Sequence, residues 1–279
     1  MIFEALSSPL VQRALIATLL VSIICGTIGV FIVVKRLSSL AGGLSHAAFG
    51  GIGLGILCGL PPLVGAVLFC LFGAVVLAVV YHRRRQSLDT LIAIFWSSGM
   101  SLGIVSLSLS PGYAPDLSTY LFGSLLFIPD TYLWLAAGVS VLTLGITYHF
   151  YRDFQAVAFD EEFSQISGLP VERLLILLLS LIALATVLLL QVTGAILTIA
   201  LLTTPAVIAL QWSRSLALCM LLGGLISASS SLAGIFLGYW FSYSASLEIP
   251  TGPLIILILT LVYAISTATK AARVSKKLD

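Results

Sequence analysis

Apolar residues along this chain occur in long runs, and short polar clusters separate one run from the next. Each run approaches the roughly 20 residues that a helix needs to cross the hydrocarbon core of a bilayer. The connection at 192–195 is so short that a break inside one helix is an alternative there, which would leave about eight spans. The pattern otherwise predicts about nine membrane-spanning helices, over residues 13–34, 44–60, 62–82, 88–110, 131–150, 173–192, 194–212, 215–241 and 253–269.

Composition sets the fold class. Of the 279 residues, 59% are hydrophobic and 9% are charged, whereas a soluble domain carries about 25% charged residues. We therefore expect an all-α, polytopic membrane protein that forms a single domain over residues 1–279 and contacts the lipid bilayer with its outer surface. The net charge of +2 says little by itself. No nucleic-acid partner is expected.

The basic residues between the predicted spans indicate an orientation. A bias of lysine and arginine toward the cytoplasmic side is typical of multi-pass membrane proteins. We therefore expect the N-terminus outside, because every basic residue except Arg13 is then cytoplasmic. These residues are Lys35, Arg36, Arg83, Arg84, Arg85, Arg152, Arg173, Arg214, Lys270, Arg273, Lys276 and Lys277.

The same orientation places a group of acidic residues on the outer side of the membrane. They are Glu4, Asp116, Asp130 and Glu248. An acidic outer face attracts cations or binds a partner that has a basic rim. Ordinary solvated loop charges are the alternative interpretation of these four residues.

A lone histidine, His46, lies among small residues in the second predicted span, after the letters GGLS and before AAFGG. Ionisable groups at membrane depth usually face a cavity or a substrate path. A neutral imidazole suits zinc and other borderline cations, whereas harder cations prefer oxygen ligands. One histidine cannot complete a metal site, so it needs a second copy of the chain or a carboxylate from another helix. A hydrogen-bonded packing histidine is the alternative.

Motifs for catalysis or nucleotide binding are missing from the sequence. There is no GxxxxGK[ST] loop, so if ATP drives this protein, another chain must bind it. No HExxH, GxSxG or paired-carboxylate arrangement occurs either. Ser45 and His46 are not a catalytic pair, because neighbouring side chains on a helix diverge by about 100°. We therefore expect no enzyme activity and no cofactor bound by this chain.

The longest predicted cytoplasmic connection, at about residues 151–172, contains the segment FDEEFSQISGLPVERL. It begins with Asp160, Glu161 and Glu162 and continues as a short amphipathic stretch. Gly168, followed closely by a proline, is a helix-stop signal. We expect a short helix held between two spans, which suits contact with a soluble partner. A plain surface helix is the alternative.

Small residues recur every four positions in two spans, which places them on one face of each helix. Such faces let helix backbones approach closely in lipid. Packing within one subunit is the first interpretation, and a subunit interface or a moving helix is the alternative. The two ridges are Ala47, Gly51, Gly55 and Gly59, and then Ser230, Gly234 and Gly238.

Four segments together resemble one family of transporters. They are VVKRLSSLAGGLSHAAFGGIGLG, DLSTYLFGSLL, FDEEFSQISGLPV and VTGAILTIALLTTPAVIAL. Over almost its whole length the chain is similar to permease subunits of the bacterial ABC importers for zinc, manganese and iron, which are relatives of the vitamin B12 and siderophore permeases. The resemblance implies that permease fold and a location in the bacterial or archaeal cytoplasmic (inner) membrane.

The resemblance also implies partners. Two copies of the permease form a homodimer, a pair of ABC ATPase subunits binds ATP below them, and an extracytoplasmic metal-binding protein docks above. A divalent metal ion is the cargo and passes between the two permeases. The residues from Asp160 to Gly168 correspond to the coupling helix that enters a groove of the ATPase, with Glu161 and Glu162 among them. Glu162 and Gly168 keep the general glutamate-to-glycine spacing of importer coupling loops.

His46 matches the histidine that the family places in the translocation path, where it is a transient metal ligand, and Ser45 and Gly42 are expected in the same path. Many members carry an aspartate at the position of Gly42. Its absence disfavours manganese, which prefers oxygen ligands, so we expect zinc ahead of manganese or iron. A permease for a metal chelate such as a siderophore or haem is one alternative, and an ion-gradient-driven carrier is another.

Overall fold

The computed structural model describes residues 9–84, 86–110, 123, 128–245 and 249–275, and all regular structure within them is helical. All helices except the short α8 and α9 are long and apolar enough to cross a membrane, so the described residues contain nine candidate spans. The predicted all-α, multi-pass fold is confirmed. The helices are α2 (Pro9–Val34), α3 (Ser38–Leu57), α4 (Pro62–Arg84), α5 (Leu88–Leu109), α7 (Asp130–His149), α8 (Tyr151–Phe159), α9 (Glu161–Ile166), α10 (Val171–Thr193), α11 (Ala195–Trp212), α12 (Leu216–Ala245) and α13 (Thr251–Ser275).

The second span starts earlier than predicted, at Ser38 instead of residue 44. Its start follows from a tight end to α2, where the Leu37 N–H donates to the Ile32 carbonyl (2.7 Å). The Arg36 N–H donates to the Val33 carbonyl (3.0 Å), and Arg36 takes the left-handed conformation (φ 58°) that closes this helix-ending motif. Because the connection between α2 and α3 is so short, His46 lies about two helical turns inside α3.

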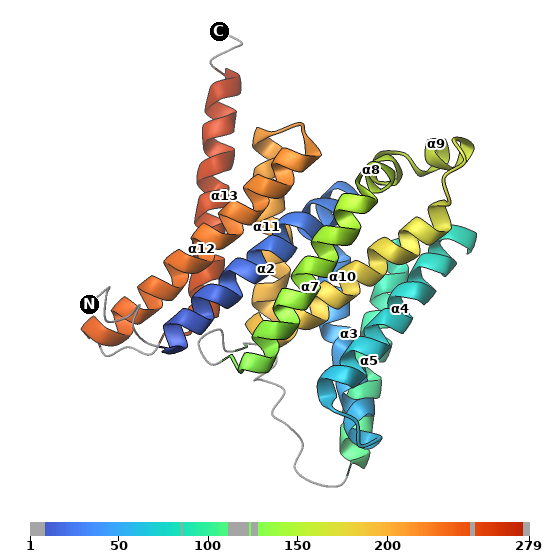
Figure 1. The fold of residues 1–279 in the computed structure, drawn as a ribbon, viewed down its shortest axis with the longest axis horizontal. Coiled ribbons are helices and arrows are strands. Elements are labelled where there is room, and N and C mark those ends of the chain that lie inside the picture. Colours follow the sequence, from blue (N-terminus) through green and yellow to red (C-terminus); the bar gives the residue numbers. More distant parts are fainter. Residues whose placement is uncertain (1–8, 85, 111–122, 124–127, 246–248, 276–279) are drawn as a thin grey trace.

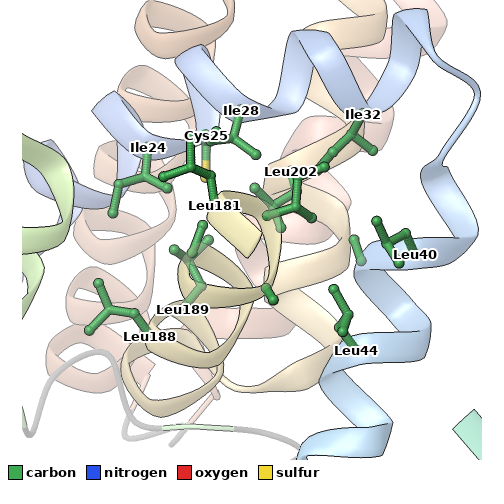
Figure 2. Packing of buried hydrophobic residues seen from close by; sticks show 14 of the residues in the cluster. Ile24, Cys25, Ile28, Ile32, Leu40, Leu44, Leu181, Leu188, Leu189 and Leu202 are labelled. Carbon is green, nitrogen blue, oxygen red and sulfur yellow. The ribbon is translucent and has the colours of Figure 1, made fainter. Parts of the chain in front are cut away.

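Helices α2, α3 and α10 are the most deeply buried spans, and the others surround them (Figure 1). Helix α10 is apolar on all sides, as expected of a helix enclosed by others. In lipid such contacts stabilise the bundle through van der Waals packing, because lipid tails are as apolar as the side chains. Figure 2 shows where α2, α3, α10 and α11 meet, at Ile24, Cys25, Ile28, Ile32, Leu40, Leu44, Leu181, Leu188, Leu189 and Leu202.

Helix α3 packs its backbone directly against two neighbours. On one side Gly51 and Gly55 lie against Gly65 of α4, and on another side Gly50 lies against Gly99 of α5. A Cβ atom at Gly50 would come within 2.6 Å of the Gly99 carbonyl oxygen. Ala47, Gly51 and Gly55 of the predicted ridge therefore serve close packing within one subunit, whereas Gly59 lies in the turn after α3 with nothing within 4 Å of an added Cβ atom. On α12, Gly234 and Gly238 pack against side chains of α13, Ile255 and Thr251.

Helices α3 and α5 run parallel, because their contacts advance together along both helices. At the start of each helix, the Ser39 hydroxyl donates a hydrogen bond to Oδ1 of Asp89. Further along, Gly53 lies against Gly103. The first turns of the two helices therefore lie side by side at one end of the bundle. We call this the basic end, because it also holds Lys35, Arg36, Arg83 and Arg84.

A buried corner joins α10 to α11, so these are two helices rather than one interrupted span. Gly194 forms the corner with a φ of 82°. The Thr198 hydroxyl donates to the Gly194 carbonyl (2.7 Å) and lies 3.0 Å from the Thr193 hydroxyl. Gly123 approaches so closely that a Cβ atom there would overlap the corner backbone. Two of the sequence segments that carry the family resemblance thus meet here, each through a glycine.

Because α3 and α5 touch at Gly50, we predict that a larger side chain at this position destabilises the protein. Replacing Gly50 with Val forces the two backbones apart, and overpacking of this kind costs about 1–3 kcal/mol. We expect Gly50→Val to lower the yield and the melting temperature of the purified protein in detergent. Gly138→Val is the matched control, since a Cβ atom at Gly138 meets nothing within 4 Å. Equal melting temperatures for the two variants would contradict the packing described here.

Candidate functional site

His46 lies on the open face of α3. Between residues 40 and 53 of this otherwise buried helix, only Gly42 and His46 are half-exposed. The imidazole stacks on the indole of Trp96 from α5, with ring centroids 4.8 Å apart and an interplanar angle of 7°. The Trp96 N–H in turn donates to the sulfur of Met100 (3.0 Å). This stack holds the plane of the imidazole at the seam between α3 and α5.

One nitrogen of the imidazole lacks a hydrogen-bond partner. Nδ1 of His46 is buried, and no described atom of the chain bonds to it. Histidines that hold a resident metal normally donate their second N–H to a carboxylate or carbonyl, which fixes the ring as a ligand. The described residues also contain no group of three or more His, Cys, Asp or Glu side chains that could hold a metal ion. The described residues of one subunit therefore do not form a resident metal site around His46.

The other two predicted path residues lie in different surroundings. Ser45 is fully buried, and its hydroxyl donates to the Ala41 carbonyl (2.8 Å), so it does not share the open face with His46. Gly42 does share that face, one helical turn before the histidine. A Cβ atom at Gly42 would lie 3.5 Å from the side chain of Ile199 in α11, which is ordinary contact. The open face therefore has room for a Cβ atom at this position.

The seam between α3 and α5 contains a carboxylate that the sequence analysis did not select. Asp89 lies seven residues before Trp96 on α5, just as its hydrogen-bond partner Ser39 lies seven residues before His46 on α3. Seven residues make about two turns, or roughly 10 Å. Asp89 therefore lies on the same seam as His46 but nearer the basic end. The small residue Ala93 lies between them on α5. Only the parallel register of the two helices reveals this relation.

At the basic end, α8 and α9 form the connection between α7 and α10. Helix α9 lies at the outer edge of the bundle (Figure 1). Asp160 caps the start of α9, since its carboxylate accepts a hydrogen bond from the Phe163 N–H (2.9 Å). Gly168 ends the helix with a φ of 85°, and the Leu169 N–H donates back to the Ser164 carbonyl (3.1 Å). The predicted short helix is present and ends at the predicted glycine, whereas the capping role of Asp160 was not predicted.

The three acidic residues at the start of this helix have different surroundings. Glu161 points inward and forms an ion pair with Lys35 from the end of α2. The Tyr81 hydroxyl of α4 donates to the same carboxylate oxygen (3.0 Å). Glu162 is exposed, and Asp160 is occupied as the cap. Asp160 and Glu162 are therefore the exposed acids of this segment, whereas Glu161 is half-buried against the spans.

Large apolar side chains project from the same region. Phe163 and Ile166 of α9 are 65% and 85% exposed, and Phe159 at the end of α8 is 66% exposed. An exposed apolar group on a surface that faces water usually marks a site of protein contact. These three residues were not among those selected from the sequence. The available signal was a large apolar residue every three to four positions, although Asp160 separates Phe159 on α8 from Phe163 and Ile166 on α9.

A cavity of about 630 Å³ lies beside α9, between it and the ends of α2 and α4. Basic and acidic side chains both line it. The lining includes Lys35, Arg36, His82, Asp160, Glu162 and Gln165. Helix α9 thus borders a polar recess on one side and presents apolar side chains to the exterior on the other.

The predicted outer acidic face is only partly described. Asp130 begins α7 and forms an ion pair with Arg13 of α2 (2.9 Å), with both side chains exposed. Its charge is therefore balanced within the subunit. Glu4, Asp116 and Glu248 lie outside the described residues, so the acidic docking face stays a prediction.

Long spans that leave one histidine on an open helix face, and that carry a projecting helix at their basic end, form the architecture of a membrane transporter permease. Comparison with known proteins agrees. The chain belongs to the ABC 3 transport family, whose model matches residues 7–270. The predicted family resemblance is confirmed.

Individual relatives match over nearly the full length. The chain is 40% identical over 265 residues to the uncharacterized membrane protein slr2045 of Synechocystis, covering 95% of this chain and 92% of the relative. It is 32% identical over 238 residues to the manganese import system permease protein ScaB of Streptococcus gordonii, covering 85% of each. Among solved structures, PsaBC from Streptococcus pneumoniae in complex with Fab superposes with a TM-score of 0.80 at 30% identity and 95% coverage of both chains.

Proposed function

We propose that this chain is the membrane-spanning subunit of an ATP-driven importer for a divalent metal ion, with ATP bound by a separate ATPase subunit. The single observation that carries the proposal is α9, a capped helix that projects from the basic end with Phe163 and Ile166 exposed. In a carrier driven by an ion gradient, this projecting helix would be unexplained. The absence of a nucleotide-binding loop from the sequence makes a separate ATPase necessary.

The proposed orientation places the basic end in the cytoplasm of a bacterial or archaeal cell. Lys35, Arg36, Arg83 and Arg84 all lie at that end, and basic residues favour the cytoplasmic side of the cytoplasmic membrane. Helix α9 is then where an ATPase can reach it. The opposite end, with Arg13 and Asp130, faces the extracytoplasmic metal-binding protein.

We further propose that two copies of the chain form the path, with their α3–α5 seams facing each other. The half-exposed His46 then has a second imidazole available from the partner copy, which one subunit lacks. Hydroxyls on the exposed side of α5, including Ser97 and Ser98, bond back to their own helix carbonyls. Such faces are polar enough to line a path and remain compatible with the membrane.

Zinc is our preferred cargo, ahead of manganese and iron. The imidazole of His46 suits a borderline cation, and Gly42 supplies no carboxylate beside it. ScaB of Streptococcus gordonii is named as a manganese permease, and manganese favours oxygen ligands. In this chain the carboxylate along the described seam is Asp89, about two turns from the histidine. The proposed path therefore offers nitrogen and oxygen ligands in sequence rather than together.

Co-purification tests the class of the protein. A tagged chain, extracted gently from its native membrane, is expected to retain an ATPase subunit at about one copy per permease, because α9 provides the docking surface. Quantitative mass spectrometry of the purified complex measures the ratio. A homo-oligomer without an ATPase, under conditions that keep other ABC complexes intact, would support a gradient-driven carrier instead.

His46 is expected to be needed for transport but not for assembly. His46→Ala removes the imidazole from the open face, and we expect zinc uptake at limiting metal to fall at least about tenfold, equivalent to ~1.4 kcal/mol. His149→Ala is the control, since His149 lies at the end of α7. Unchanged uptake in His46→Ala would remove this histidine from the path.

Gly42→Asp tests the cargo: it is expected to raise manganese uptake relative to zinc.

Phe163 and Ile166 are expected to hold the ATPase. Buried aromatic and aliphatic anchors commonly contribute 2 kcal/mol or more to an interface, so the double variant Phe163→Ala, Ile166→Ala should weaken ATPase binding at least about tenfold. Phe72→Ala is the matched control, because Phe72 is 67% exposed but lies within the α4 span. Binding is measured by titrating purified ATPase onto the permease in nanodiscs. Equal affinities for both variants would refute the docking surface.

A further inference from the structure

Lys35 is a charged side chain that the molecule keeps almost entirely from solvent. Its side chain is 5% exposed. The ammonium group donates to the Val157 carbonyl in the last turns of α8 (3.0 Å) and pairs with the carboxylate of Glu161 in the first turn of α9. The hydroxyl of Tyr81 donates to the same carboxylate oxygen (3.0 Å). We call Lys35, Tyr81 and Glu161 the Lys35 cluster.

Burying the charged groups of the Lys35 cluster costs free energy that packing of apolar side chains would not cost. Removing two charges from water is expensive, and apolar side chains of similar size often stabilise a buried position as well or better. Charged hydrogen bonds, however, fix direction and distance. Two donors converge on one carboxylate oxygen here, so Glu161 is held in a single place relative to both α2 and α4. The cluster therefore provides defined geometry more than stability.

The position of the Lys35 cluster links α9 to the helix that carries His46. Lys35 directly precedes the short turn at Arg36 and Leu37, and α3 begins immediately after that turn. Tyr81 lies in the last turns of α4, and α4 contacts α3 backbone to backbone through Gly65. Helix α9 is therefore connected to α3 by contacts along two routes, through the end of α2 and through α4.

We propose that the Lys35 cluster is the joint that transmits movement of α9 to α3, and that Lys35, Tyr81 and Glu161 are positioning residues for transport. This inference rests on the proposed function, in which an ATPase moves α9. It separates two tasks within one short segment. Phe163 and Ile166 on the outer side hold the ATPase, and Glu161 on the inner side passes its movement to the spans.

The test measures coupling rather than activity alone. The complete complex, reconstituted in proteoliposomes with its ATPase and binding protein, is assayed for zinc transported per ATP hydrolysed. We expect Lys35→Met and Glu161→Gln to lower this ratio at least tenfold while ATPase binding and ATP hydrolysis persist. Tyr81→Phe removes one hydrogen bond only and should lower the ratio several-fold. Lys35→Arg keeps both the charge and the donors, and should stay within twofold of the wild type.

A second ion pair at the basic end provides the control. Arg83 of α4 pairs with Glu172 of α10 (2.9 Å), but Arg83 is largely exposed and the pair does not involve α9. Arg83→Met is expected to leave the transport ratio unchanged. An equal loss of coupling in Arg83→Met and Lys35→Met would overturn the proposal, because the effect would then not be specific to the joint.

The remaining outcomes are also decisive. A normal transport ratio in folded Lys35→Met and Glu161→Gln overturns the joint. Loss of ATPase binding in these variants also overturns it, since the cluster would then only shape the docking surface. If Lys35→Met does not fold, Tyr81→Phe decides alone, with an unchanged ratio counting against the joint. Failure of the wild-type complex to couple ATP hydrolysis to metal uptake refutes the proposed function itself and is seen before any variant is compared.

Discussion

Direct backbone contact at the glycines of α3 is the interaction on which the rest of this bundle depends. Between helices in lipid, the hydrophobic effect gives little attraction, and close approach must supply it. Gly50 and Gly51 bring α3 against α5 and α4 at distances that any side chain would prevent. The parallel register that results aligns His46 with Trp96 and Ser39 with Asp89. The candidate path is therefore a product of helix packing rather than of any local sequence motif.

The basic end shows how one short stretch of chain serves several purposes. The tight end of α2 places Lys35 beside α9 and starts α3 without a loop. Helix α9 begins at the Asp160 cap and ends at Gly168. Its inner side is tied to the spans by Glu161, and its outer side is apolar and exposed. A soluble partner can thus bind a preformed surface that is already connected to the membrane helices.

Much of this architecture could be predicted from the sequence. Apolar run length indicated the spans, and the glycine–proline stop in FDEEFSQISGLPV indicated α9, because both signals act locally. The inward turn of Glu161 could not be predicted, since it depends on Lys35, which is far away in the chain. Asp89 and Trp96 were missed for the same reason: their relation to His46 exists only in the register of two helices. Ser45 was expected beside His46 in the path, yet successive helical side chains diverge, and it is buried.

The glycine contacts of α3 also constrain how this protein can move. The backbones of α3 and α4 touch at Gly51 and Gly65, and those of α3 and α5 touch at Gly50 and Gly99. No side chains separate the helices at these points. Sliding or rotating α3 alone would drive backbone atoms into one another. We therefore expect helices α3, α4 and α5 to shift together, so that rearrangement of the bundle takes place at the borders of this three-helix unit.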